Sequence, residues 1–223
     1  MDGMTPTILL DLDGTLIDSA PGIYSSLRHA FAAHGLPVPD EATLRTFVGP
    51  PIHDSMRRHH VPEELVEPVV ASYREAFAAG GLYDATVYDG VPEALQALRD
   101  AGVRLVVATA KPEVFAGPIV ERLGLDRFVD GVFGAPLDEG TSKGDIIARA
   151  LSTSAAGLDA GALLMVGDRE HDVHGAIENG LRAVGVRWGY AQPGELEDAG
   201  ATAVVAEPAD LAATALELLR AAA

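Results

Sequence analysis

Two carboxylates, Asp11 and Asp13, stand directly after a short apolar run and are followed by Gly14 and Thr15. Alternation along an extended segment puts both carboxylates on the same side of the chain. Two like charges that are this close cost free energy unless a cation or a proton relieves them. Oxygen ligands in a chain without cysteine favour Mg²⁺, which prefers carboxylates, waters and a phosphate. The segment therefore predicts a magnesium site, where Gly14 would let the backbone approach a bound group.

A second polar segment follows the apolar run at residues 103–108 and begins with Thr109 and Ala110. The Thr109 hydroxyl and the backbone N–H groups around Ala110 can donate hydrogen bonds to an anionic oxygen. Lys111 comes next, and two interpretations of it stay open: a solvated loop lysine or a residue that contacts the substrate.

The third candidate is Lys143, which follows Ser142, a residue that we expect to cap the start of a helix. A cation at this end opposes the helix dipole, and a bound anion would offset that mismatch. The 16 basic residues comprise 14 arginines and only two lysines, Lys111 and Lys143. A lysine kept here indicates that a compact ammonium group is needed.

The fourth segment starts with Asp168, directly after an apolar run, and continues to Asp172. Asp168 could complete the metal shell. Asp172 lies one helical turn further along the same face.

Several apolar runs of about strand length must position these residues. They alternate with helical patterns such as 92–101, 112–123 and 168–179, each followed by Gly102, Gly124 or Gly180. Near-continuous apolar strands between helices predict an α/β fold, a doubly wound parallel sheet covered on both faces. The expected strands are Thr7–Leu10, Val103–Ala108, Leu163–Val166, Ala183–Val186 and, more weakly, Ala201–Val205.

The region from about residue 18 to residue 82 breaks this rhythm. It holds helical patterns at 23–33, 41–47, 52–60 and 63–79, and it contains no convincing strand. We predict an all-helical cap over residues 18–82, inserted after the first strand into a core of residues 1–17 and 83–223. Whether its Gly49–Pro51 segment meets the substrate stays open.

Composition excludes several classes of function. The 223 residues carry a net charge of 16 − 33 = −17, so anionic partners would be repelled and we expect neither nucleic acid nor membrane as a partner. No stretch approaches the ~20 apolar residues of a membrane span. The absence of cysteine excludes disulfides and thiolate catalysis, and it fits the cytoplasmic location that we expect.

The four segments, in order, resemble the four motifs of the haloacid dehalogenase-like hydrolase superfamily. The place of the helical insert resembles the members with a cap after the first strand. Residues 108–112 (ATAKP) and 167–172 (GDREHD) are especially similar to the phosphoglycolate-phosphatase-like members. The likeness extends from Ile8 to about Leu219.

This resemblance implies a phosphatase acting on a small phosphomonoester, such as phosphoglycolate, through an aspartyl-phosphate. Asp11 would be the nucleophile, and Asp13 would be the general acid and then the general base. Mg²⁺ would be held by Asp11, Asp168 and the backbone carbonyl of Asp13, with Asp172 in support. The phosphate-binding residues would be Gly14, Thr15, Thr109, Ala110 and Lys143.

Three alternatives stay open. A phosphosugar mutase resembling β-phosphoglucomutase, or a 5′-nucleotidase, would share the fold and the aspartyl-phosphate. A phospho-aspartate binding module without turnover would belong to a different class of protein. In each case the partner is a small phosphorylated molecule or the phosphoryl group itself, and we expect a monomer or a weak homodimer.

Overall fold

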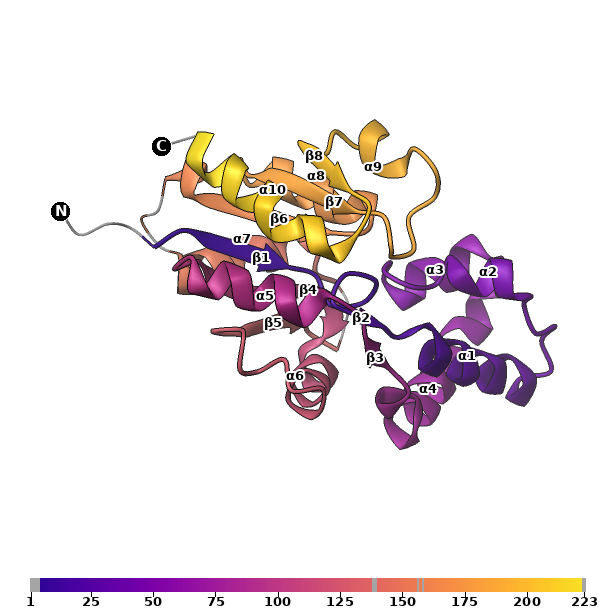
Figure 1. The fold of residues 1–223 in the computed structure, drawn as a ribbon. Coiled ribbons are helices and arrows are strands. Elements are labelled where there is room, and N and C mark those ends of the chain that lie inside the picture. The colour runs from indigo at the N-terminus through magenta and orange to yellow at the C-terminus, as the bar shows by residue number, and fades with distance from the viewer. Residues whose placement is uncertain (1–4, 138–139, 156, 158, 222–223) are drawn as a thin grey trace.

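The computed structural model describes residues 5–137, 140–155, 157 and 159–221. Six parallel strands form one sheet in the order β5-β4-β1-β6-β7-β8, which confirms the predicted doubly wound α/β fold (Figure 1). Their bounds are β1 Thr7–Leu10, β4 Arg104–Pro112, β5 Val132–Ala135, β6 Leu163–Gly167, β7 Arg182–Val186 and β8 Ala203–Val205.

The strand β1 occupies the middle of the sheet and is fully buried. Its last residue, Leu10, pairs with Val107 of β4 on one side and with Val166 of β6 on the other. Because β1 and β6 end almost in register here while β4 runs on beside them to Pro112, the residues that follow β1 and β6 meet the last residues of β4 at one edge of the sheet. This register positions the polar segments that the sequence singles out.

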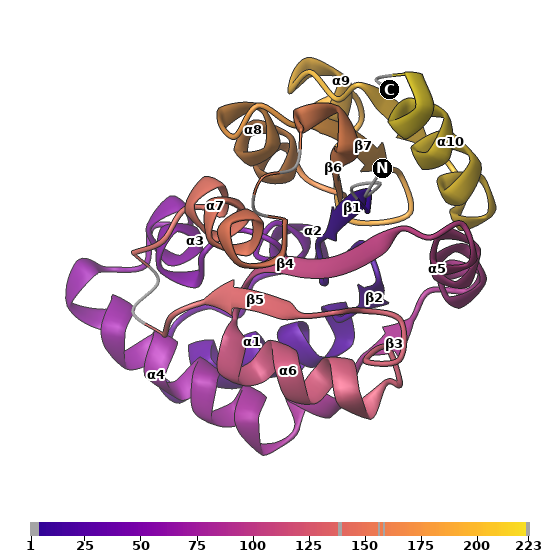
Figure 2. The same cartoon turned by 90° about the vertical axis from the view of Figure 1, so that its left-hand side faces the viewer.

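Helices cover both faces of the sheet, as Figure 2 shows. Helices α5 (Val91–Asp100) and α10 (Pro208–Ala221) pack on one face, with α6 (Glu113–Arg122) near the β5 edge. Helices α7 (Lys143–Ser154), α8 (Glu170–Glu178) and α9 (Glu195–Asp198) cover the other face. Two layers of buried aliphatic side chains hold this three-layer core together.

Four further helices lie beyond the carboxyl end of β1 and form the cap (Figure 1). An antiparallel pair of two-residue strands, β2 (Ile17–Asp18) and β3 (Thr86–Val87), joins the cap to the core. The cap helices are α1 (Ala20–Ala33), α2 (Glu41–Arg45), α3 (Ile52–Arg58) and α4 (Glu63–Ala79). The predicted boundary at residues 18–82 remains a prediction.

Some elements were not expected from the sequence. These are the strand pair β2–β3, the edge strand β5, helices α9 and α10, and two short 3₁₀ turns, η1 (Gly81–Tyr83) and η2 (Ala160–Ala162). Strand β4 also runs on to Pro112, with an irregular register after Thr109 that turns the end of the strand.

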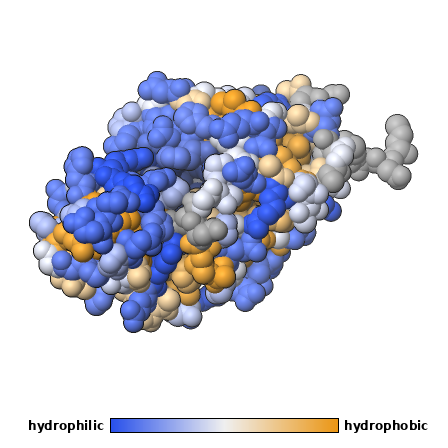
Figure 3. All heavy atoms as spheres, turned by 180° about the vertical axis from the view of Figure 1, so that it is seen from behind, coloured by the Kyte–Doolittle hydropathy of each residue, from blue (hydrophilic) through white to orange (hydrophobic). Residues whose placement is uncertain are grey.

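Hydrophilic residues dominate the face of the molecule in Figure 3, and apolar residues gather there in a few smaller areas. Among the described helices, none combines the length and the apolarity that crossing a membrane requires.

Candidate active site

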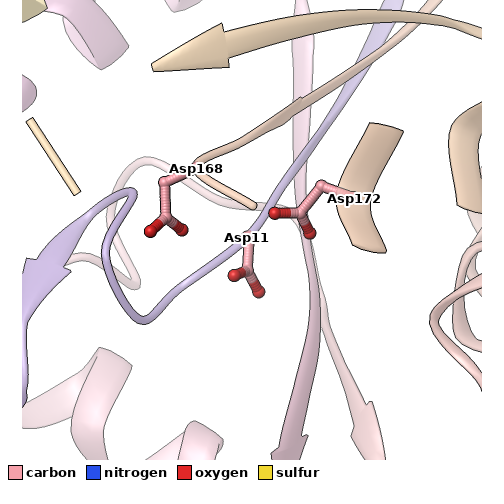
Figure 4. A group of neighbouring side chains, drawn as sticks. All are labelled: Asp11, Asp168 and Asp172. Atoms are coloured by element: carbon pink, nitrogen blue, oxygen red, sulfur yellow. The ribbon is translucent and has the colours of Figure 1, made fainter. Parts of the chain in front are cut away.

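Three buried carboxylates meet where β1 and β6 end (Figure 4). Asp11 directly follows β1, Asp168 directly follows β6, and Asp172 lies in the first turn of α8. One oxygen atom from each of the three lies within 4.8 Å of the others. Such a set of carboxylate oxygens fits a divalent cation such as Mg²⁺.

Burial and mutual repulsion disfavour the charged forms of these carboxyl groups. The pKa of Asp11 is raised to about 6, mainly by burial: the ammonium of Lys143 lowers it, and the carboxylates of Asp172 and Asp13 raise it. Burial also raises the pKa of Asp168 well above its ordinary value, and the neighbouring Asp172 and Asp11 add to the effect. The site therefore holds more negative charge than its own cations offset, which a bound cation would correct.

Lys143 supplies the ammonium closest to this cluster. Its Nζ lies 2.7 Å from Asp11 Oδ1 and 2.7 Å from Asp172 Oδ1. Burial alone would lower the lysine pKa, but the attraction of the two carboxylates raises it above the ordinary value, so the group stays charged. The predicted helix cap is confirmed, because the Ser142 side chain accepts from the Asp145 N–H at 3.1 Å.

Backbone and hydroxyl groups orient Asp168. The Tyr190 N–H donates to its Oδ2 at 2.7 Å, and the Thr15 hydroxyl donates to its Oδ1 at 3.2 Å. Gly14, at φ +82°, lies so close to Asp168 that a Cβ there would collide with the carboxylate, which explains the glycine. The phosphate contact predicted for Thr15 stays a prediction, since here its hydroxyl serves Asp168.

Asp13 faces a different partner. Its Oδ2 lies 2.9 Å from the Nζ of Lys111, whereas its Oδ1 is buried and has no hydrogen-bond partner among the described residues. Lys111 is itself buried, which excludes the interpretation as a solvated loop lysine. The Lys111 N–H donates to the buried Thr109 hydroxyl at 3.2 Å, which orients that hydroxyl at the irregular end of β4.

A cavity of about 60 Å³ lies between the core and the cap, beside Asp13 and Lys111. The Gly49–Pro51 segment lines this cavity. Its contact with the substrate stays a prediction. Aromatic and aliphatic side chains form most of the wall. The lining residues are Asp13, Ala110, Lys111, Pro112 and Phe115 of the core, and Ile23, Phe47, Gly49, Pro50, Pro51, Ile52, Tyr73, Arg74 and Phe77 of the cap.

Sequence reasoning missed Arg169, which follows Asp168. Its Nη1 donates to the Val48 carbonyl of the cap at 2.6 Å, and its Nε donates to Glu195 at 2.7 Å. A Cβ on Gly49 would lie 3.2 Å from the Arg169 side chain, so the cap segment rests on this arginine. The position of Arg169 next to the predicted metal ligand Asp168 could have singled it out. The sequence does not show, however, that its side chain reaches the cap.

Two more links between cap and core also escaped prediction. Arg45 of α2 donates from Nη2 to the Gly189 carbonyl at 2.6 Å. The Tyr190 hydroxyl donates to Asp18 at 2.7 Å and accepts from the Ala20 N–H at 3.1 Å. Because the Tyr190 backbone also holds Asp168, one residue ties the start of the cap to the carboxylate cluster.

Comparisons with known proteins agree with this geometry. The chain is 42% identical over 193 residues to a 5′-nucleotidase of Pseudomonas aeruginosa, covering 86% of each chain. It is 40% identical over 198 residues to the tyrosine-protein kinase PtkA of Mycobacterium tuberculosis, covering 88% of this chain and 67% of the relative. It is 31% identical over 201 residues to a phosphoglycolate phosphatase of Agrobacterium fabrum, covering 84% and 82%.

A solved structure shows the same fold over almost the whole chain. The crystal structure of a predicted phosphatase from Clostridium acetobutylicum superposes with a TM-score of 0.89 at 37% identity, covering 96% of this chain and 100% of that one. The family model described as haloacid dehalogenase-like hydrolase matches residues 8–186, which include all four polar segments. The chain therefore belongs to the haloacid dehalogenase-like hydrolases.

Proposed function

We propose that this enzyme is a Mg²⁺-dependent phosphatase that hydrolyses a small phosphomonoester through a phosphorylated Asp11. One observation carries the proposal: Asp11 belongs to a cluster of buried carboxylates and pairs with the buried ammonium of Lys143. A second carboxylate, Asp13, borders the adjoining cavity. These contacts support the roles of Asp11 as nucleophile, Lys143 as charge-offsetting group and Asp13 as acid–base group.

Asp11, Asp168 and the backbone carbonyl of Asp13 would hold the Mg²⁺ ion, and Asp172 would support it. The all-oxygen donor set and the raised pKa of Asp11 support this assignment. When bound, the ion offsets negative charge on the phosphoryl group and on the carboxylates.

Asp11 attacks phosphorus, forming an oxygen–phosphorus bond while the ester bond to the leaving alcohol breaks. Asp13 donates a proton to the leaving oxygen. In the second step Asp13 takes a proton from water, whose oxygen attacks phosphorus and releases phosphate and Asp11. Repulsion between two unit charges 4 Å apart amounts to about 4 kcal/mol at an effective dielectric of 20, and Lys143 acts against it.

The identity of the leaving alcohol depends on the cap side of the cavity. Phosphoglycolate is our first candidate, from the sequence resemblance and the phosphoglycolate phosphatase relative. A nucleoside 5′-monophosphate is the second candidate, because a 5′-nucleotidase shares 42% of the aligned residues. The tyrosine kinase relative indicates a further test, namely transfer of the phosphoryl group to an acceptor other than water.

Phosphate release from p-nitrophenyl phosphate, with and without Mg²⁺, tests the reaction. A panel of phosphoglycolate, nucleoside 5′-monophosphates and sugar phosphates then tests the substrate. We expect Mg²⁺-dependent release of phosphate without any bisphosphate primer. A need for such a primer would indicate a phosphosugar mutase, and phosphorylation of the protein without turnover would indicate a binding module.

Two further expectations from the sequence stay predictions. They are the cytoplasmic location and the monomeric or weakly dimeric state.

A further inference from the structure

We propose that Lys111 is a positioning residue that links closure of the cap to the acid–base carboxylate of Asp13. The inference rests on the proposed function, in which Asp13 exchanges a proton with the leaving oxygen. It concerns a side chain that reaches the cavity from the irregular end of β4.

The two oxygen atoms of Asp13 have unequal surroundings. Lys111 Nζ holds Oδ2 at 2.9 Å, and both side chains are at least nine-tenths buried. Oδ1 is buried and has no hydrogen-bond partner among the described residues. A carboxylate fixed through one oxygen presents the other in a defined direction, so Oδ1 is the atom left to exchange a proton with the substrate.

The second contact of Lys111 comes from the cap. Its Nζ lies 4.7 Å from the ring centre of Phe77 in α4, the distance of a cation–π contact. The ring of Phe77 stacks on Tyr73 at 5.8 Å and meets Phe115 of the core edge-on at 5.6 Å. The Phe77 ring that faces Lys111 is therefore in contact with aromatic rings of both the cap and the core.

These contacts couple the cap to Asp13 through solvation. With the cap in place, the Phe77 ring covers the ammonium and keeps water away, which strengthens its attraction to the Asp13 carboxylate. Moving the cap away would remove the ring and let water reach the ammonium, so that the ion pair would hold Asp13 less firmly. The acid–base group is then oriented when the substrate is enclosed.

Lys143 provides an internal contrast. Its two close partners, Asp11 and Asp172, both belong to the core. Lys143 thus serves the nucleophile irrespective of the cap, whereas Lys111 joins the two parts.

The test compares two aryl esters of similar shape, p-nitrophenyl phosphate and phenyl phosphate, in single turnovers of the Mg²⁺-loaded enzyme. The first-turnover rate of phenol release reports on the step in which Asp13 donates a proton. Phenolate needs that proton more than the nitrophenolate does. In Lys111→Met, release from phenyl phosphate should fall about tenfold further than release from p-nitrophenyl phosphate, roughly the effect of losing one hydrogen bond to a charged group.

Two more variants separate positioning from folding. Phe77→Leu should change the ratio of the two rates in the same direction but by less, while Phe31→Leu, elsewhere in the cap, should leave that ratio unchanged. In an Asp13→Asn background, Lys111→Met should have little further effect on phenol release, because the residues act as a unit.

Equal losses for both esters in Lys111→Met, or full additivity with Asp13→Asn, would overturn the proposal. If the wild-type enzyme releases neither phenol with Mg²⁺ present, the proposed function fails instead, so the two failures are distinguishable.

Discussion

The core side and the cap side of the cavity beside Asp13 are lined by different kinds of side chain. On the core side, charged groups such as Asp13 and Lys111 stand where strands end, and the register of a buried sheet fixes their places. On the cap side, rings and prolines from helices and from the Gly49–Pro51 segment form most of the wall, and Arg74 adds a charged group. The contrast supports our proposal that the core supplies the reaction and that the cap selects the alcohol.

The two sides also differ in how they are held. Asp11 and Asp168 directly follow β1 and β6, two strands that are hydrogen-bonded on both sides. The cap meets the core through a pair of two-residue strands and a few arginine contacts, among them Arg169 to Val48. Changes on the core side should therefore alter the rate for every substrate, and changes on the cap side should alter the selection among substrates.

The largest effect should follow from Asp11→Asn. Removing the nucleophile should lower turnover at least about a thousandfold for every ester, with the fold retained. Phosphate release and thermal unfolding without Mg²⁺ would measure both parts. Activity above a few per cent of wild type would show that another group attacks phosphorus.

The second largest loss of activity should follow from Lys143→Met. Losing an electrostatic contact of this kind typically costs about 10²–10³ in kcat. The loss should be the same for small and large esters, because both partners of Lys143 belong to the core. Arg149→Met in the same helix is the matched control, since its ion pair with Glu113 is half exposed. A Lys143 variant within threefold of wild type would count against the assignment.

Arg169→Met addresses the contact between the two sides. The guanidinium bonds to Val48 and Glu195 are largely buried, so we expect kcat/KM to fall about ten- to a hundredfold, the range for hydrogen bonds to charged groups. Arg187→Met is the control, because that arginine forms an exposed pair with Glu197. If both variants lose activity equally, the contact between Arg169 and the cap has no special role.

Mg²⁺ affinity should depend on pH through Asp11. Without a cation its pKa is raised to about 6, so below pH 6 a proton occupies the carboxylate that the ion needs. We expect affinity to weaken by at least about tenfold per pH unit below pH 6, because protonation of Asp168, whose pKa is also raised, adds to that of Asp11. Calorimetric titrations from pH 5 to pH 8 would measure this, and an affinity independent of pH would contradict the raised pKa.

The smallest effect should come from Gly49→Ala on the cap side. Gly49 has φ +103°, which an alanine adopts only with strain of about 1–2 kcal/mol. Its Cβ would also press on Arg169. We expect KM to rise about three- to tenfold, within the range of such strain, and kcat to change little. A fall in kcat with KM unchanged would place this segment in the reaction rather than in selection.

The sequence indicated that the core residues of the site lie together, because local patterns place each of them, while their roles stay predictions. Asp11, Asp168 and Lys143 each stand at the end of an apolar run or the start of a capped helix, and the sheet register then brings them together. The fold class needed no side-chain detail, because near-continuous apolar runs that alternate with helices already indicate a doubly wound parallel sheet.

The cap side was less predictable for physical reasons. Strands β2 and β3 have two residues each, too few to show a periodic pattern, and β5 contains a glycine that weakens its strand signal. The partners of Lys111 and Arg169, namely Phe77 and Val48, are distant in sequence and depend on how the cap packs. No local pattern encodes such contacts.

Trapping the phosphorylated enzyme tests the central claim most directly. The protein would be mixed with Mg²⁺ and p-nitrophenyl phosphate, quenched in acid during the first turnover, digested and analysed by mass spectrometry. We predict a single phosphoryl group on the peptide that contains Asp11, formed and lost at the rate of turnover and absent from Asp11→Asn. Release of phosphate with no phosphorylated peptide, or with the phosphoryl group on another residue, would contradict the account.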